Sequence, residues 1–107
     1  MENLFKETKK MLEVCHKTPK DEVWIGTYKG TEFITWTEFT KLANFDYNND
    51  FGAIEIRPDL VVMGKDWWLE RHEYDTKEWW EYKELPKLKE NPKKLTRLKA
   101  TPDDQHL

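Results

Sequence analysis

Two tryptophan doublets, Trp67-Trp68 and Trp79-Trp80, lie on either side of a polar segment that can form a turn, and they constrain the fold most strongly. Neighbouring side chains on a β-strand point to opposite faces of the sheet, so each doublet places one indole on each face. A buried core accounts for one set of rings. The other set must be covered by a helix, a second sheet, the tail of the chain or another molecule.

The stretch 67–85 is predicted to form a β-hairpin with Thr76 and Lys77 at the centre of its turn. This register pairs Tyr74 with Trp79, His72 with Glu81, Glu70 with Lys83, and Trp68 with Leu85. One face then carries the candidate partner-binding residues, which are Trp68, Glu70, His72, Tyr74, Trp79 and Glu81. The opposite face carries Trp67, Leu69, Arg71, Trp80 and Tyr82, and Arg71 can lie over Tyr82 or Trp80.

The second of these faces, which also has Glu73 and Glu84 across from Trp80 and Leu69, is more typical of a core. The first has charged residues between its aromatic rings, which is typical of a surface or an interface, and Trp, Tyr and Arg often anchor interfaces. The alternative is that the N-terminal helix or the tail covers Trp68 and Trp79. The sequence leaves both interpretations open.

The rest of the chain alternates helical and extended patterns. Apolar residues at helical spacing predict a helix over 2–17, and alternation predicts a hairpin of strands 22–28 and 32–36. Thr35 and Glu38 have capping-box spacing, so a short helix from Trp36 to about Asn44 should bury Phe39, Leu42 and Ala43. Residues 46–52 read as a loop, followed by strands over 53–57 and 60–63.

These elements predict an α+β fold in a single domain, residues 1–86. An N-terminal helix and a short second helix should pack on an antiparallel sheet of five or six strands arranged as a β-meander. Residues 87–107 form a basic C-terminal tail, in which Asn91-Pro92 can start a short helix over 92–99.

Charge is distributed unevenly along the chain. Residues 1–85 contain 12 Lys and Arg against 18 Asp and Glu, a net charge of −6, whereas residues 86–107 contain 6 against 3, a net of +3. The cations of the tail are Lys87, Lys89, Lys93, Lys94, Arg97 and Lys99. Nucleic-acid binding over a broad face needs clustered cations, so we do not expect the acidic body to bind nucleic acid in this way.

Composition also indicates the compartment. No apolar run approaches the roughly 20 residues that span a bilayer, so we expect no membrane insertion. The first residues lack the layout of a secretory signal, and the single Cys15 excludes an internal disulfide and suits a reducing compartment. We therefore expect the protein in the cytoplasm.

The candidate chemical groups do not form a recognised catalytic pattern. Glu70, His72 and Glu81 share one face, but they lack a fourth ligand, and His72-Glu73-Tyr74-Asp75 is not the His-Glu-x-x-His zinc motif. The run 46–50 begins like a calcium-binding loop, but Phe51 occupies the position of the required glycine. We expect no enzymatic activity, no cofactor and no bound metal.

The tryptophan hairpin resembles small uncharacterised proteins of phages and prophages of Gram-positive bacteria. The resemblance rests on the residues Trp67-Trp68-Leu69-Glu70-Arg71-His72-Glu73-Tyr74-Asp75 and Glu78-Trp79-Trp80-Glu81. The related turns have glycine after the aspartate, where this chain has Thr76. The resemblance implies a viral accessory protein in the host cytoplasm and supplies no catalytic residues.

Three functions follow as hypotheses. The first is a non-catalytic protein that binds and inhibits or redirects a host or defence protein, such as a nuclease, in the manner of anti-CRISPR or anti-restriction proteins. This hypothesis rests on analogy with the class of small acidic phage proteins. An acidic surface would suit a target built to hold nucleic acid. The second is a structural phage protein that forms a homodimer through the hairpin. The third is a weak nucleic-acid binder that uses the basic tail with exposed tryptophans.

Overall fold

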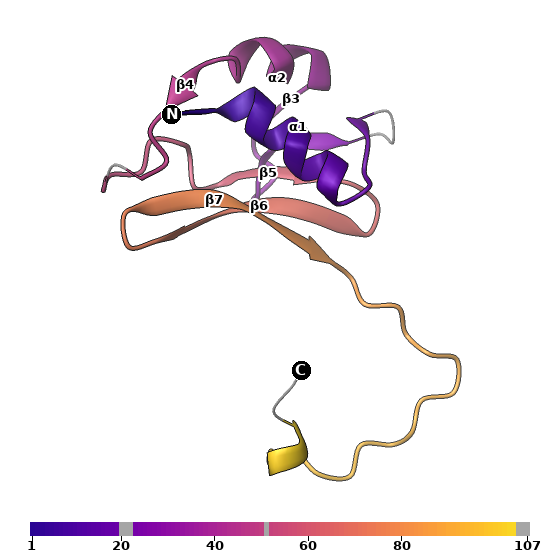
Figure 1. The fold of residues 1–107 in the computed structure, drawn as a ribbon. Helices are drawn as coiled ribbons and strands as arrows, with labels where there is room; N and C mark the ends of the chain where they lie inside the picture. The colour runs from indigo at the N-terminus through magenta and orange to yellow at the C-terminus, as the bar shows by residue number, and fades with distance from the viewer. Residues whose placement is uncertain (20–22, 51, 105–107) are drawn as a thin grey trace.

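The computed structural model describes residues 1–19, 23–50 and 52–104 (Figure 1). Its elements, in chain order, are β1 (Glu2–Asn3), α1 (Leu4–Val14), β2 (Trp24–Thr27), β3 (Phe33–Ile34), α2 (Trp36–Leu42), β4 (Asp46–Tyr47), β5 (Leu60–Met63), β6 (Trp67–Tyr74), β7 (Lys77–Glu84) and a 3-10 helix, η2 (Pro102–Asp104). Helices and an antiparallel sheet make an α+β fold, as predicted from the sequence.

The predicted N-terminal helix is confirmed with narrower bounds. The side chain of Asn3 caps its first turn by accepting a hydrogen bond from the Lys6 N–H. At the other end His16 adopts a left-handed conformation with φ of 58°, and the N–H of Lys17 donates to the carbonyl of Leu12. This is the Schellman arrangement, here formed without the usual glycine.

The second helix begins where the sequence predicts. Thr35 caps α2, and both hydrogen bonds of the capping box with Glu38 are present. Phe39 and Ala43 are buried, but Leu42 is 66% exposed, so its predicted burial is wrong. The hairpin before α2 is confirmed as β2 and β3, although Glu22, its predicted first residue, lies outside the described residues.

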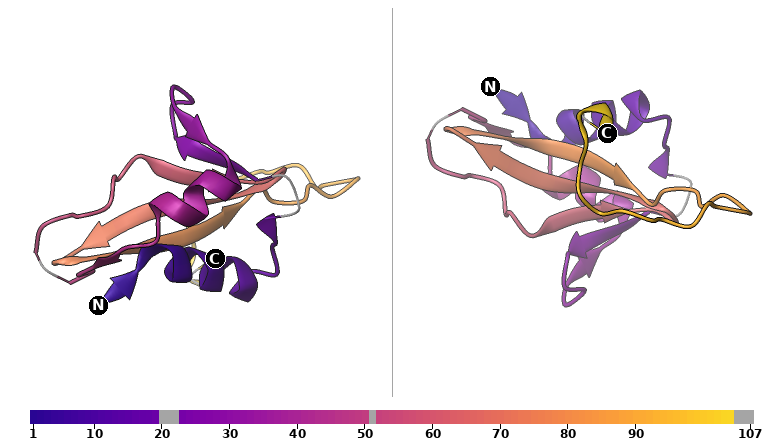
Figure 2. Two further views of the ribbon diagram at one scale, coloured as in Figure 1. Left: turned by 90° about the horizontal axis from the view of Figure 1, so that it is seen from above. Right: turned by 90° about the horizontal axis from the view of Figure 1, so that it is seen from below.

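The main sheet has five antiparallel strands in the order β3-β2-β5-β6-β7, within the predicted range. Only β5-β6-β7 is a meander of three consecutive strands, because β5 pairs with β2, which precedes it in the sequence by two strands and a helix. β1 and β4 form a separate two-stranded sheet. Both helices lie on one side of the main sheet (Figures 1 and 2). The core fills this layer and contains Leu4, Leu12, Ile25, Phe39, Val62, Trp67, Leu69 and Trp80.

The predicted strand over 53–57 is wrong. These residues form no strand, although Ile54 and Ile56 alternate with charged residues. The backbone N–H groups of Glu55 and Ile56 donate instead to the buried carboxylate of Glu78 on β7, at 2.8 and 3.1 Å. A side chain therefore satisfies the polar groups that a neighbouring strand would otherwise satisfy.

The predicted register of the tryptophan hairpin is also wrong, by two residues. Asp75 and Thr76, with φ of 48° and 75°, form the turn, so Tyr74 pairs with Lys77 and His72 with Trp79. Positive φ at both turn positions is the geometry of a two-residue type I′ hairpin turn. A shift of two residues leaves every side chain on its predicted face, because the side-chain period is two.

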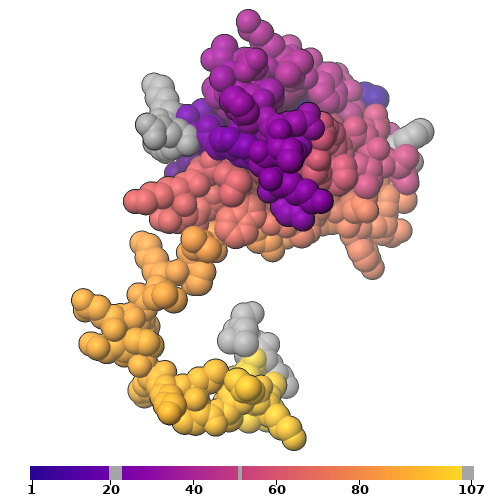
Figure 3. Space-filling view, turned by 180° about the vertical axis from the view of Figure 1, so that it is seen from behind, coloured from indigo at the N-terminus to yellow at the C-terminus, as the bar shows by residue number. Residues whose placement is uncertain are grey.

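The tail leaves β7 on the side of the sheet opposite the helices and extends away from the body as a single segment (Figures 1 and 3). Residues 85–103 are exposed. The predicted helix over 92–99 does not form, and the one helical turn in the described tail is η2. Arg97 holds this turn through two hydrogen bonds with the Asp104 carboxylate, at 2.8 and 3.2 Å.

Candidate protein-binding face

The face of the sheet opposite the helices, which we call the outer face, carries most of the candidate residues. Seen from below, neither α1 nor α2 crosses this face, and the extended tail passes in front of it (Figure 2). Strand register aligns Trp24, Met63, Trp68 and Lys83 in one row across four strands. The next rows bring Val61 beside Glu70 and Glu81, and His72 beside Trp79. The outer face thus combines large apolar side chains with a small group of charges.

All six residues predicted for partner binding lie on the outer face. Trp68, Glu70, His72, Trp79 and Glu81 cluster on its middle and are half-buried. Tyr74 lies apart, beside the turn, and is 77% exposed. The tail cations are exposed on the tail and do not join this cluster.

The sequence alone missed the contribution of β2 and β5 to this face. Trp24 lies over Gly26, where a Cβ would come within 2.7 Å of the indole, so the absence of a side chain makes room for the ring. A hollow of about 510 Å³ lies alongside, and its lining includes Tyr28, Pro58, Val61, Met63, Trp68 and Glu70. The alternation of Trp24 with Ile25 was a usable signal for the face, but the pairing of β2 with β5 was not visible in it.

A chain of polar contacts joins the charges of the outer face. Glu70 accepts a hydrogen bond from Trp68 Nε1 at 2.6 Å, and His72 lies between two carboxylates, with Nε2 2.6 Å from Glu70 and Nδ1 2.6 Å from Glu81. Lys83 Nζ lies 3.8 Å from Glu81. Glu70 and Glu81 are directly opposite each other, so the imidazole separates two like charges that would otherwise be adjacent.

This network lowers the pKa of Glu70 below its ordinary value of 4.5. The Trp68 hydrogen bond is the main cause, and burial of the carboxyl opposes it. His72 and Glu81 are in contact as the sequence predicted, but diagonally, since His72 is directly opposite Trp79. The two rings are tilted by 33° with their centroids 6.5 Å apart.

The polar network offers little to a substrate or a metal. Both ring nitrogens of His72 already face carboxylates, so neither is presented to solvent as a free base. Within residues 1–19, 23–50 and 52–104, no three His, Cys, Asp or Glu side chains are placed to hold a metal ion. In the loop considered for calcium, the side chain of Asn48 instead accepts a hydrogen bond from the Asp50 N–H, which forms a local turn. The first two residues of the predicted loop, Asp46 and Tyr47, form β4, so this part of the prediction is wrong.

A second polar cluster lies on the core side of the hairpin, and sequence reasoning found only one part of it. Arg71, whose side chain is 3% exposed, lies 4.9 Å from the Trp80 ring centroid, which confirms one of its two predicted stacking partners. Its guanidinium also reaches Glu78 at 3.2 Å, Glu7 at 3.4 Å and the Tyr47 hydroxyl at 3.1 Å. The sequence did offer one signal for this cluster: alternation places Glu78 on the core face of the hairpin, and a buried charge needs a partner of opposite charge.

Burial controls the titration of this cluster. It raises the pKa of Glu7, despite the hydrogen bond from the Tyr47 hydroxyl at 2.5 Å and the nearby Arg71. It also raises the pKa of Tyr47, with the Glu7 hydrogen bond acting in the same direction. These residues link α1, β4 and the hairpin, so the cluster holds the helical layer on the sheet rather than facing a ligand.

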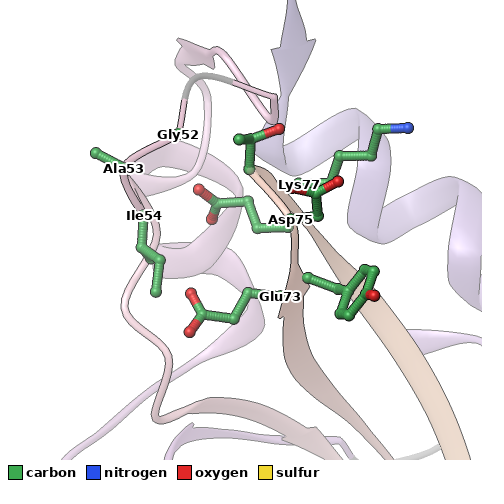
Figure 4. A pocket seen from close by; sticks show the side chains of 9 residues that line it. Gly52, Ala53, Ile54, Glu73, Asp75 and Lys77 are labelled. Atoms are coloured by element: carbon green, nitrogen blue, oxygen red, sulfur yellow. The ribbon is translucent and has the colours of Figure 1, made fainter.

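A smaller hollow of about 230 Å³ lies at the tip of the hairpin. It is bounded by 52–54 on one side and 73–78 on the other, and Glu73 extends toward Ile54 across it (Figure 4). Glu78, one of its lining residues, is already bonded to Arg71 and to two backbone N–H groups. The hollow is therefore a gap between the loop and the hairpin, and its buried carboxylate, Glu78, is already hydrogen-bonded within the protein.

Comparison with protein-family models, curated proteins and solved structures gives no match for this chain. Within the part of the chain that the structure describes, neither helix has the length and apolar character needed to cross a membrane.

Proposed function

We propose that this protein is a non-catalytic binding protein whose outer face docks on another protein. The proposal includes the phage context indicated by the resemblance of the hairpin, in which the target is a host or defence protein that becomes inhibited or redirected. The observation that carries the proposal is the outer face itself, where the half-buried Trp68 lines a hollow of about 510 Å³ and neither α1 nor α2 crosses the face.

Three properties of this face support protein recognition. Trp68, Trp79 and Tyr74 are of the residue types that contribute most to interface energies when they enter a partner's pocket. They are held on paired strands, so little conformational freedom is lost when they bind. The carboxylates Glu70 and Glu81 add a polar feature that can select a partner with complementary charge.

The charges also favour a particular kind of target. The body of the chain is acidic, with a net charge of −6 over residues 1–85. Such a body is attracted to a basic surface and repelled by an acidic one, which raises the association rate with nucleic-acid-binding proteins. A nuclease or another protein with a basic groove is therefore the proposed class of target.

Affinity capture from host cells tests this function with two substitutions on the outer face. The double variant Tyr74→Thr and Trp79→Thr keeps residue types that favour strands but removes both rings. We expect it to lose the captured partner while its circular dichroism and thermal unfolding remain cooperative. Val14→Ala and Leu42→Ala, both exposed on the helical side, are matched controls and should capture normally.

Capture that is equal for the outer-face variant and the controls would refute the proposal. A variant that loses cooperative unfolding would instead show that these rings belong to the core. Replacing Tyr74 alone then separates the two cases, because this side chain is 77% exposed and contributes little to stability.

A further inference from the structure

The tail presents three leucines to water, and each has a lysine next to it in the sequence. Leu88, Leu95 and Leu98 are 89%, 71% and 89% exposed. Five lysines accompany them, and none forms an ion pair within the described residues: Lys87, Lys89, Lys93, Lys94 and Lys99. A segment with both leucines and unpaired cations matches a surface that is apolar and acidic.

The tail begins beside such a surface. Glu84, the last residue of β7, pairs with Trp67, and the Leu85 N–H donates to the Asp66 carbonyl at 2.8 Å. Beyond Leu85, every hydrogen bond and ion pair of the described tail is internal, between Arg97, Asp104 and their neighbours. The tail is therefore anchored at the end of the β6–β7 hairpin and then extends away from its own body, on the side of the sheet opposite the helices (Figures 1 and 3).

The outer face has the complementary chemistry. Its hollow of about 510 Å³ is lined mainly by apolar side chains, among them Val61, Met63 and Trp68. Two charged residues, Glu70 and Arg71, also line it, and the guanidinium of Arg71 is paired with Glu78 and Glu7 on the core side. Glu81 lies directly across from Glu70 on the neighbouring strand. Leucines that enter the hollow would bring the adjacent lysines close to these carboxylates, where opposite charges attract.

We propose that the tail of one copy docks on the outer face of a second copy, and that the reciprocal exchange forms a closed dimer. In this arrangement Leu95 and Leu98 occupy the hollow of the partner copy, and Lys93 and Lys94 approach Glu70 and Glu81. The chain from Leu85 to Leu95 can span up to about 33 Å when extended, enough to cross to a neighbouring body. A two-fold exchange satisfies both tails and both outer faces, so no surface remains for further growth.

The tail exchange uses the same outer face that the proposed function assigns to the target. In the dimer, a target must therefore displace the tail before it can bind this face. The exchange itself does not need a foreign partner. The dimer can form whether or not a host target exists, and if no dimer forms, the outer face is directly available to a target.

Sedimentation of the full chain over a concentration series tests the exchange. We expect the chain to dimerise, and the double variant Leu95→Ser and Leu98→Ser to raise the dissociation constant by at least about tenfold. Added salt should also weaken the dimer, because part of the contact is electrostatic. Leu42→Ser, which removes an equally exposed leucine from α2, is the matched control and should dimerise like the parent chain.

Mixing variants gives a readout that misfolding cannot mimic. The tail variant retains an intact outer face, and Trp68→Thr with Trp79→Thr retains an intact tail. Each alone should dimerise at least about tenfold more weakly than the parent chain. A mixture of the two should form a heterodimer of intermediate affinity, since one of its two contacts is restored.

A full chain that stays monomeric, or a dimer that is unaffected by the tail variant, would overturn the exchange. A monomer whose tryptophan fluorescence changes in the tail variant would place the tail on its own outer face instead, which also overturns it. In either case partner capture by the outer face is unaffected. Conversely, a tail-dependent dimer without face-dependent capture would refute the proposed function alone.

Discussion

Replacing Glu78 with alanine should destabilise this protein far more than the same change at Glu73, the exposed residue directly opposite it. The Glu78 side chain is 5% exposed, and one oxygen accepts a hydrogen bond from the Glu55 N–H at 2.8 Å. The other oxygen accepts from the Ile56 N–H at 3.1 Å and from Arg71 at 3.2 Å. A single carboxylate therefore holds a loop without secondary structure and neutralises a buried guanidinium.

The expected cost follows from these contacts. Removing one partner of a buried ion pair typically costs about 3–5 kcal/mol when the remaining charge is left without compensation. Here Glu7, 3.4 Å from Arg71, still compensates part of the guanidinium charge, so we expect the lower end of this range. Each buried N–H that loses its acceptor adds about 1–3 kcal/mol, unless the loop opens and water reaches it. Since the loop over 53–57 can open, we expect a total near 4 kcal/mol rather than the sum. That is a large part of the roughly 5–15 kcal/mol that stabilises a typical domain.

Urea unfolding and amide hydrogen exchange measure the two parts of this prediction. Glu78→Ala should lower the free energy of unfolding by about 4 kcal/mol, and Glu78→Gln should lower it less, because its amide oxygen still accepts a hydrogen bond. The amides of Glu55 and Ile56 should lose protection before the rest of the sheet. Glu73→Ala is the matched control, because Glu73 lies directly opposite Glu78 but is exposed.

The control should change stability by no more than about 0.5 kcal/mol. Equal costs for Glu78→Ala and Glu73→Ala would refute the reasoning. So would unchanged exchange of the Glu55 and Ile56 amides in the Glu78→Ala variant.

Three further predictions concern other contacts. Thr8→Val should cost about 1–3 kcal/mol in urea unfolding, because the Trp80 Nε1–H, now 2.8 Å from the Thr8 hydroxyl, would be buried without an acceptor, and Trp80→Phe should remove most of that extra cost. Trp68→Phe should raise the pKa of Glu70 toward 4.5 in a ¹³C NMR titration, because it removes the hydrogen bond that lowers this pKa. In the parent chain, the lowered pKa of folded Glu70 contributes stability above pH 4.5, and this stability is lost as the pH falls through the pKa of the folded state. The variant should therefore lose less stability than the parent chain over the same acidic range. His16→Gly should stabilise the protein by about 1 kcal/mol in thermal unfolding, since glycine adopts the positive φ at the end of α1 without steric cost; an unchanged or lower midpoint would contradict the assigned strain.

Local spacing predicted those features that depend on neighbours in the chain. The capping box at Thr35 and Glu38 formed as expected, because both partners lie within one helical turn. The two faces of the hairpin were also predicted correctly, since alternation assigns each side chain to a face whatever the turn. The turn itself was misplaced because Asp75 and Thr76 adopt positive φ without a glycine to indicate it.

Tertiary structure decided what partners distant residues have. The strand-like alternation over 53–57 was overruled because Glu78, far along the chain, supplies the acceptors for its backbone. Arg71 and Glu7 are 64 positions apart, and only the packing of α1 on the sheet brings them together. The outer face follows the same division. Alternation determined which residues point outward. Only the pairing of β2 with β5 and of β5 with β6 placed Trp24 and Met63 beside Trp68, because strand order depends on long-range packing that no local pattern encodes.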